Sequence, residues 1–338
     1  MINVGVIGLG MMGLTHLDAY AKRDDVNVVA IADKDPNRLS GKVKAVGNVE
    51  GQAQGGFDFD KPKKYEEGMD LIRSKRVDAV DICLPTHMHL EYAKSAIRKG
   101  KHVLIEKPLA RTAKDAAKLV ALAEKSAGVS MCAMCMRFWP GWSWLKDAVD
   151  DKRYGKVMSA QFRRVASHPG GAFYASGELS GGAILDLHIH DTDFVQFLFG
   201  PPKAVSSRGY SKVTTAVDHV VTHYIYDDIP IVVAEGSWAM AEKFPFSMAY
   251  TINFEQATAV YTMGSDHPLT LYRPGNAPEK VELEKAMGYD LEIDNFLNCI
   301  KNGTKPTTVT LADAANTIRI IEAEEKSVRT GKPVNVKI

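Results

Sequence analysis

The sequence predicts an α/β protein of two domains: a doubly wound parallel sheet first, then an α/β domain around a large, open, mainly antiparallel sheet. Three observations predict this fold class. Strand-like and helix-like segments alternate through residue 128, which is typical of βαβ units. A glycine-rich turn joins the first strand to the first helix. Beyond residue 204, alternating strand patterns succeed one another with turns between them. We therefore expect domains at 1–128 and 129–338.

The first strand and turn carry a dinucleotide-binding pattern. Residues 2–7 form a β-branched run that predicts a buried strand, and a helical pattern follows through Tyr20. The first glycine of the turn permits a tight bend, the second lets a pyrophosphate approach the backbone, and the third lets helix and strand pack closely. The helix N-terminus offers N–H groups to the phosphates. We expect the cofactor at Gly8, Gly10, Met11, Met12 and Gly13.

An acidic residue after the second strand indicates which dinucleotide fits. Asp33 follows the apolar run 26–32, where a carboxylate can accept the ribose hydroxyls of NAD. A 2′-phosphate at this position would meet like charge, which favours NAD over NADP. Lys34 and Arg38 keep NADP open as an alternative, because a flexible cation can hold that phosphate.

A lysine stands where another short apolar strand, 102–105, ends. The strand runs into Glu106, Lys107 and Pro108. Ligands of open parallel α/β sheets bind beyond the carboxyl ends of the strands. We therefore expect Lys107 to point its charge at the place where cofactor and substrate meet, and Pro108 to stiffen the strand exit by fixing one backbone angle. An ordinary exposed lysine that closes a strand is the alternative.

A helical segment that begins after the glycines at 181–182 and reaches Phe199 combines acids with a histidine. On one continuous helix, Asp186, His190 and Asp193 share a face. An aspartate one turn before a histidine can orient the imidazole and make it a proton acceptor near neutral pH. The alternative is a core histidine that is hydrogen-bonded to a capping aspartate.

The same segment offers possible metal ligands, but we expect no metal. The potential ligands are His188, His190, Asp191 and Asp193. A His-x-His pair diverges on a helix, which argues against a shared ion.

Aromatic side chains near residue 140 and on a later loop are candidates for contacts with a substrate. Trp142 has a flat apolar face that suits the C–H face of a sugar, and Arg137 can donate to hydroxyl groups. Trp139 fits packing at a domain hinge better. His168 and Tyr174, on the loop that leads to Asp186, are either substrate contacts or ordinary loop residues.

Composition is that of a globular enzyme-sized chain. Its 338 residues are 45% hydrophobic and 25% charged, and 42 basic residues against 41 acidic ones exclude a general attraction to nucleic acid or to an anionic membrane. No apolar run is long enough to span a bilayer, and the first strand begins at residue 2, which leaves no room for a secretory signal. Cys132 and Cys135 would face opposite sides of a strand, so we expect four reduced thiols and a cytoplasmic protein.

The order and spacing of these motifs resemble the glucose–fructose oxidoreductase / inositol dehydrogenase / MocA family over almost the whole chain. The resemblance rests on the glycine turn, Asp33, the strand exit 85–89, residues 106–108, the glycine pair with Asp186 and His190, and the tail 294–336. One departure is the longer, glycine-rich segment 47–62.

The resemblance implies a role for each of these motifs. Lys107, Asp186 and His190 match the catalytic trio of the family, and the helix 311–329 is expected to pack back on the first domain. Asp193, on the same expected helix face as Asp186 and His190, is a further candidate for a substrate contact. Further cofactor contacts are expected at Pro85, Thr86, His89, Glu106 and Lys107, although His89 can also simply begin a helix.

We therefore expect an NAD(P)-dependent dehydrogenase that acts on a secondary alcohol of a sugar, inositol or related polyol. His190 takes the hydroxyl proton, Asp186 holds the imidazole, and Lys107 stabilises the developing alkoxide, although either His190 or Lys107 can be the formal base. Alternatives are a glycosidase or lyase that oxidises a sugar transiently, and a non-catalytic sugar-sensing regulator. A partly apolar outer sheet face predicts a homodimer or homotetramer.

Overall fold

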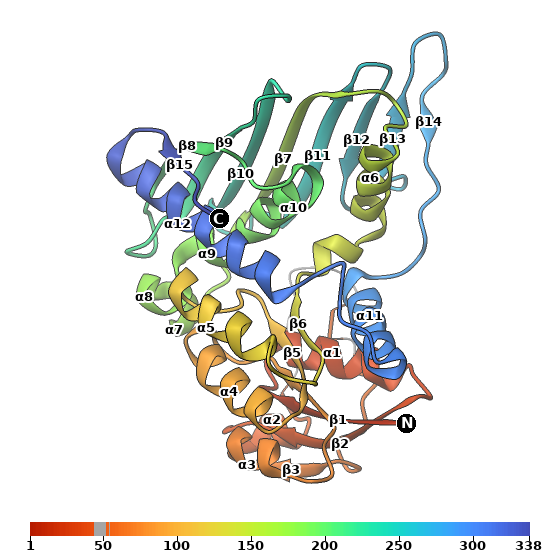
Figure 1. The fold of residues 1–338 in the computed structure, drawn as a ribbon, viewed down its shortest axis with the longest axis vertical. Helices are drawn as coiled ribbons and strands as arrows, with labels where there is room; N and C mark the ends of the chain where they lie inside the picture. The colour runs from red at the N-terminus through yellow and green to blue at the C-terminus, as the bar shows by residue number, and fades with distance from the viewer. Residues whose placement is uncertain (44–51, 54) are drawn as a thin grey trace. The chain divides into compact units, whose positions relative to one another are not determined.

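The computed structural model describes residues 1–43, 52–53 and 55–338, which form two compact units (Figure 1). Unit 1 comprises residues 1–135 and 287–315, and unit 2 comprises residues 136–286 and 316–338. The glycine-rich segment 47–62, noted above as a departure from the resembled family, lies partly outside the described residues.

Unit 1 is built on a six-stranded parallel sheet with the order β3-β2-β1-β4-β5-β6. This order reverses between β1 and β4, as in dinucleotide-binding folds, and it confirms the predicted parallel sheet. Its elements are β1 (Ile2–Ile7), α1 (Met11–Ala21), β2 (Val26–Ala32), α2 (Pro36–Leu39), β3 (Lys63–Tyr65), α3 (Gly68–Arg73), β4 (Ala79–Ile82), α4 (Thr86–Arg98), β5 (His102–Glu106), α5 (Ala113–Ala123), β6 (Ser130–Ala133) and α11 (Gly288–Asn302).

The central strands of this sheet are buried on both faces because helices cover them, so their sequences are almost continuously apolar. Local signals set the helix ends. The Thr112 hydroxyl accepts a hydrogen bond from the N–H of Asp115 and caps α5, as the threonine before that helix predicted. The buried Asp81 is an exception to the apolar pattern of β4.

Unit 2 is built on a nine-stranded sheet with the order β14-β13-β12-β11-β7-β10-β9-β8-β15. All neighbours are antiparallel except β7 and β10, which run parallel. Its elements are a 3-10 helix (Cys135–Phe138), α6 (Pro140–Asp150), β7 (Val157–Ser167), α7 (Ala172–Ala175), α8 (Gly177–Ser180), α9 (Gly182–Asp186), α10 (Ile189–Phe199), β8 (Ala204–Tyr210), β9 (His219–Ile225), β10 (Ile231–Met240), β11 (Ser247–Phe254), β12 (Thr258–Thr262), β13 (Leu269–Tyr272), β14 (Glu279–Lys280), α12 (Leu311–Thr330) and β15 (Val334–Asn335). The large, mainly antiparallel sheet is confirmed.

The observed units differ from the predicted domain limits in two places. β6 pairs with β5, so the parallel sheet continues past residue 128. Residues 287–315, which contain α11, belong to unit 1, whereas α12 from residue 316 onward belongs to unit 2. Thr317 and Glu324 of α12 hydrogen-bond to Asp193 and Thr192 of α10. The C-terminal helix therefore packs on unit 2 over this part of its length.

Candidate cofactor-binding and active site

The glycine turn between β1 and α1 has the geometry that the sequence predicts. Gly8 has a φ of +90°, and an added Cβ would lie 2.5 Å from the carbonyl oxygen of Cys83. An added Cβ at Gly13 would lie 1.9 Å from the Gly8 oxygen, so these two positions require glycine. At Gly10 an added Cβ would meet nothing within 4 Å. The space beyond Gly10, at a helix N-terminus without a side-chain cap, fits an approaching diphosphate.

The Asp33 carboxylate is held beside this turn. Its Oδ2 accepts a hydrogen bond from the N–H of Leu9 at 2.7 Å, and its Oδ1 accepts one from the N–H of Asp35 at 2.9 Å. The Arg38 guanidinium lies 3.7 Å from Asp33 Oδ2 and 3.9 Å from Asp35 Oδ2. Lys34 extends instead toward Glu67, 3.8 Å away. The Asp33 carboxylate is therefore fixed, and the nearby cations Arg38 and Lys34 already face acidic side chains. This arrangement suits ribose hydroxyls better than a 2′-phosphate.

Four parallel strands of unit 1 bring predicted site residues to one edge of the sheet. The carboxyl ends of β1, β2, β4 and β5 lead into the glycine turn, Asp33, Pro85 and Lys107 respectively. Pro85 precedes the first residue of α4, and Thr86 is buried at its start. Lys107 is half-buried, and its peptide bond to Pro108 is cis. Lys107 follows β5 directly, as the sequence predicts.

His89 has a different environment from the one expected of a cofactor contact. It is fully buried, with Nδ1 2.8 Å from the Pro108 oxygen and Nε2 2.6 Å from the Leu84 oxygen. Both carbonyls can accept only if the ring carries two protons, and burial, which lowers the pKa of His89, opposes the second proton. Each ring nitrogen nevertheless lies against a main-chain carbonyl at the exit of β4 or β5. We therefore assign His89 to the support of the site.

The predicted helix with Asp186 and His190 is two helices. α9 ends at Asp186 and α10 begins at Ile189, because the Leu187 and His188 N–H groups both donate to the Ala183 oxygen and interrupt the regular ladder. The expectation of one continuous helical face was therefore wrong. Asp186 and His190 lie on either side of this junction, and both are half-buried.

Buried polar contacts fix α10 inside unit 2. Arg164 donates to both oxygens of Asp191, at 2.8 and 3.3 Å, and Arg137 donates to both oxygens of Asp193, at 2.8 and 2.7 Å. His188 faces Tyr224, whose hydroxyl lies 3.2 Å from Nε2. A helix held by two buried ion pairs presents His190 on a rigid support.

Three predicted substrate contacts instead occupy the interior of unit 2. Trp142 has no exposed surface and packs on Phe162, Phe194 and Tyr250, with ring centroids 5.8, 4.8 and 5.4 Å away. Arg137 and Asp193 satisfy each other in a bidentate pair. Aromatic rings and arginine are as useful in a core as in a binding site, so the sequence did not separate the two. We do not carry these three residues into the proposed substrate site.

The other two predicted contacts gather around one indole. His168 and Tyr174 place their rings 5.2 and 6.0 Å from Trp238 of β10, both edge to face. Both are half-buried, and among the described residues no hydrogen bond reaches His168 Nε2. Trp238 itself is tied down, because its Nε1 donates to Asp218 at 2.7 Å.

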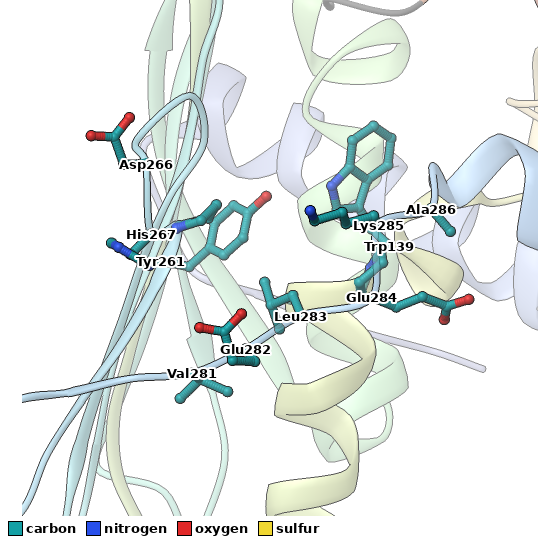
Figure 2. A pocket seen from close by; sticks show the side chains of 13 residues that line it. Trp139, Tyr261, Asp266, His267, Val281, Glu282, Leu283, Glu284, Lys285 and Ala286 are labelled. Carbon is teal, nitrogen blue, oxygen red and sulfur yellow. The ribbon is translucent and has the colours of Figure 1, made fainter.

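A separate pocket of about 250 Å³ lies within unit 2, between Trp139, Tyr261 and the segment 281–286 (Figure 2). Figure 2 shows Leu283 and Glu282 below the rings of Tyr261 and Trp139. None of the predicted substrate residues lines this pocket, so we assign it no part in the reaction.

One cluster of polar side chains in the interior of unit 1 was not predicted from the sequence. His16, Asp81, Glu106 and Glu292 meet in the interior around the imidazole of His16. A histidine on the buried side of α1 and an aspartate within an apolar strand were the available signals. Glu292 has no local signal, because only the folded chain brings α11 beside α1.

The glycine turn, the fixed carboxylate and the lysine at the strand edge define a class, the nucleotide-binding oxidoreductases with a Rossmann domain. Comparison with known families agrees. Residues 2–133 match the oxidoreductase family with an NAD-binding Rossmann fold (GFO_IDH_MocA), residues 142–260 match the GFO/IDH/MocA C-terminal domain, and residues 248–336 match the C-terminal alpha/beta domain of the oxidoreductase family. The chain belongs to the GFO/IDH/MocA family.

Individual relatives include sugar and inositol dehydrogenases. scyllo-Inositol 2-dehydrogenase (NAD(+)) of Bacillus subtilis is 24% identical, over 100% of this chain and 97% of the relative. Myo-inositol 2-dehydrogenase of Thermotoga maritima is 30% identical, over 59% of this chain and 55% of the relative, so the match spans about half the length of that protein. Levoglucosan dehydrogenase in complex with NADH and levoglucosan shares the fold, with a TM-score of 0.86 at 19% identity over 100% of both chains.

Proposed function

We propose that this protein is an NAD-dependent dehydrogenase that oxidises a secondary alcohol of a sugar, an inositol or a related polyol. The observation that carries the proposal is the shared sheet edge of unit 1, where the glycine turn, Asp33 and Lys107 follow β1, β2 and β5. A dinucleotide bound along that edge brings its nicotinamide end toward the later strands.

The catalytic roles are assigned to three side chains. When NAD is bound, its nicotinamide ring supplies the hydride acceptor. His190 takes the proton of the substrate hydroxyl, Asp186 orients the imidazole, and Lys107 donates to the same oxygen and stabilises its developing negative charge. The rigid attachment of α10 supports this role of His190, and the half-buried position of Lys107 favours a strong electrostatic effect.

NAD is preferred to NADP in this proposal. Asp33 is fixed by two main-chain hydrogen bonds where a ribose is expected, and the Arg38 guanidinium lies near the carboxylates of Asp33 and Asp35. The substrate class is supported by the relatives, whose names describe inositol and sugar dehydrogenases. His168 and Tyr174, which are half-buried and pack on the buried indole of Trp238, are proposed to face the substrate, because rings with a polar tip suit a carbohydrate.

The test is a panel of sugars, inositols and sugar acids with NAD and with NADP, read as absorbance of the reduced cofactor. At least one substrate is expected to yield NADH, with NAD preferred. Product analysis separates net oxidation from transient oxidation: a hydrolysed or eliminated product with no accumulated NADH would contradict the dehydrogenase assignment. Binding of a sugar without any turnover of cofactor would point to the regulator instead.

Two further properties are proposed with this function. Met158 and Ile231, 44% and 46% exposed on neighbouring strands β7 and β10, favour self-association through the nine-stranded sheet. All four cysteines are free thiols, which favours a reducing compartment such as the cytoplasm. Among the described residues, no helix has the length and hydropathy of a membrane span. Sedimentation of the purified protein tests the self-association.

A further inference from the structure

The interior of unit 1 holds a histidine surrounded by acids. His16 of α1 is fully buried, and its Nδ1 lies 2.8 Å from Asp81 Oδ2 of β4. Its Nε2 lies 3.2 Å from Glu106 Oε1 of β5 and 3.8 Å from Glu292 Oε1 of α11. Figure 1 shows why these groups meet, because α11 lies beside α1, far away in sequence. We call His16, Asp81, Glu106 and Glu292 the His16 cluster.

Charge balance sets the protonation of this cluster. A neutral imidazole would leave three carboxylates together in the protein interior, which is a costly arrangement. Among the described residues, neither oxygen of Glu292 makes a hydrogen bond. Burial raises the pKa of Glu292 well above its ordinary value, so this carboxyl is the neutral member. For His16, burial is the largest single effect and lowers the pKa, but the charge and hydrogen bond of Asp81 together with the contact to Cys83 outweigh it, so the pKa is raised.

Other titratable groups also face the cluster. The Tyr20 hydroxyl of α1 donates to Asp81 Oδ2 at 3.0 Å, and the sulfur of Cys83, which follows β4, lies 3.4 Å from Asp81 Oδ1. Burial raises the pKa of both Tyr20 and Cys83, so both stay neutral at pH 7. Tyr289 of α11, whose pKa burial also raises, is neutral as well and binds Gln52 through its hydroxyl. His16, Asp81 and Glu106 are the remaining titratable members of the cluster.

Glu106 connects this cluster to Lys107. Its Oε1 faces His16, and its Oε2 accepts a hydrogen bond from the main-chain N–H of Lys107 at 3.0 Å. The carboxylate is therefore held between an imidazole on the inner side and the backbone of the strand exit on the outer side.

We propose that His16, as a buried imidazolium, is a positioning residue that fixes Glu106 and thereby the main chain that presents Lys107. The inference rests on the proposed function only in giving Lys107 its role in turnover. Its physical content is a charged ring at His16 and a hydrogen-bonded amide at Lys107, and both can be measured without a substrate.

The charge of the ring is tested by nitrogen NMR of protein labelled with ¹⁵N in its histidines. The His16 signals are assigned by their loss in His16→Gln. Both ring nitrogens are expected to be protonated at pH 7, in the wild type and in Glu292→Gln, whose amide keeps the size and neutrality of the acid. A neutral His16 would overturn the proposal. So would elemental analysis that finds one bound divalent ion per chain, lost in Glu292→Gln, because His16, Glu106 and Glu292 also have the spacing of metal ligands.

The effect on Lys107 is tested by amide hydrogen exchange followed by peptide mass spectrometry. His16→Gln is expected to raise the exchange rate of the Lys107 amide at least about tenfold, since a buried hydrogen bond protects it. Leu17→Ala is the matched control, because Leu17 is fully buried on the same helix and carries no charge. Equal exchange at Lys107 in His16→Gln and the wild type would refute the positioning role, as would equal loss of protection in both variants.

Kinetics then connect the cluster with turnover. His16→Gln should lower kcat about tenfold or more while the Kd for NAD changes by less than about threefold, because the diphosphate and ribose contacts lie elsewhere. Leu17→Ala should lower the melting temperature without lowering kcat selectively relative to NAD binding. A wild-type protein with no dehydrogenase activity would refute the proposed function, and the NMR and exchange results would still decide the state of His16. If His16→Gln does not fold, the histidine NMR spectra are recorded across pH for the wild type and for Asp81→Asn, which removes the partner of Nδ1. Asp81→Asn is expected to lower the pKa of His16, and an unchanged pKa would contradict the cluster charge.

Discussion

At the scale of single residues, the candidate site depends on charges placed at the ends of strands. Asp33 and Lys107 each follow a strand of the same parallel sheet, and each is held by main-chain hydrogen bonds around it. Residue type and strand position sufficed to predict both. The sequence did not reveal that Arg137 pairs with Asp193 or that Trp142 packs on Phe194, because these partners lie far away along the chain.

Removal of the lysine is the first test at this scale. Lys107→Ala should reduce kcat by on the order of a hundredfold or more, because a preorganised donor to the reacting oxygen is lost. Lys107→Arg keeps the charge and serves as the control for charge alone. Steady-state rates and NAD titration are the measurements, and a full-rate Lys107→Ala enzyme would rule out the assigned role.

Asp33 decides between the two cofactors. Asp33→Asn keeps the size of the side chain and one acceptor for the Leu9 N–H but removes the charge. The kcat/KM for NAD should fall by about tenfold, equivalent to ~1.4 kcal/mol, and the preference for NAD over NADP should narrow. The ratio of kcat/KM with the two cofactors measures this. An unchanged ratio would mean that selectivity lies elsewhere.

Glu292 gives a pH dependence of stability. Burial raises its pKa in the folded state, so the folded protein holds a proton that the unfolded chain releases above about pH 4.5. Stability therefore falls as pH rises above that value, and Glu292→Gln removes the penalty. The variant should melt above the wild type at pH 7, by a margin that grows from pH 5 upward. Thermal melts across pH test it, with the exposed Glu284→Gln as control; a margin that shrinks with pH would contradict the buried neutral acid.

At the scale of elements, local signals placed strands and helices well wherever capping, periodicity and glycine spacing agreed. The β1–turn–α1 unit and the Thr112 cap are examples. Prediction failed at the α9–α10 junction, where helical periodicity continues through residues 187–188 although the hydrogen-bond ladder shifts. It also failed for β6 and α11, whose membership in unit 1 depends on long-range pairing.

Two glycines of the turn between β1 and α1 allow a paired test that separates folding stability from NAD binding. Gly10→Ala adds a methyl group with no atom within 4 Å, whereas Gly13→Ala drives one against the Gly8 oxygen. Gly10→Ala should keep the wild-type melting temperature and weaken NAD binding at least about tenfold, because the methyl occupies the space for the diphosphate. Gly13→Ala should lower the melting temperature by itself. Melting curves with NAD titration distinguish the two, and tight binding by Gly10→Ala would contradict the assigned site.

At the scale of the whole molecule, the chain is a member of the GFO/IDH/MocA family with a nucleotide-binding unit and a unit built on an open sheet. The predicted fold class survived in full because alternation of strands and helices is a property of long stretches, which tolerate errors at single positions. The proposed reaction draws Lys107 from unit 1 and Asp186 and His190 from unit 2. The proposal therefore assigns catalytic roles to residues of both units.

The proposed roles of Lys107 and His190 on one substrate oxygen predict that their effects on the rate are coupled. Two groups that act on the same oxygen in one step do not contribute independently, so removing the second after the first costs little more. His190→Ala alone should lose turnover while NAD binding stays near normal, and Lys107→Ala should do the same.

The most direct measurement is the single-turnover rate of NADH formation in wild type, Lys107→Ala, His190→Ala and the double variant, at saturating NAD and substrate. The account predicts that the double variant reacts within about threefold of the slower single variant, as expected for side chains that form one catalytic unit. Losses that multiply, or a single variant that reacts at the wild-type rate, would show that the two side chains do not share a reacting centre.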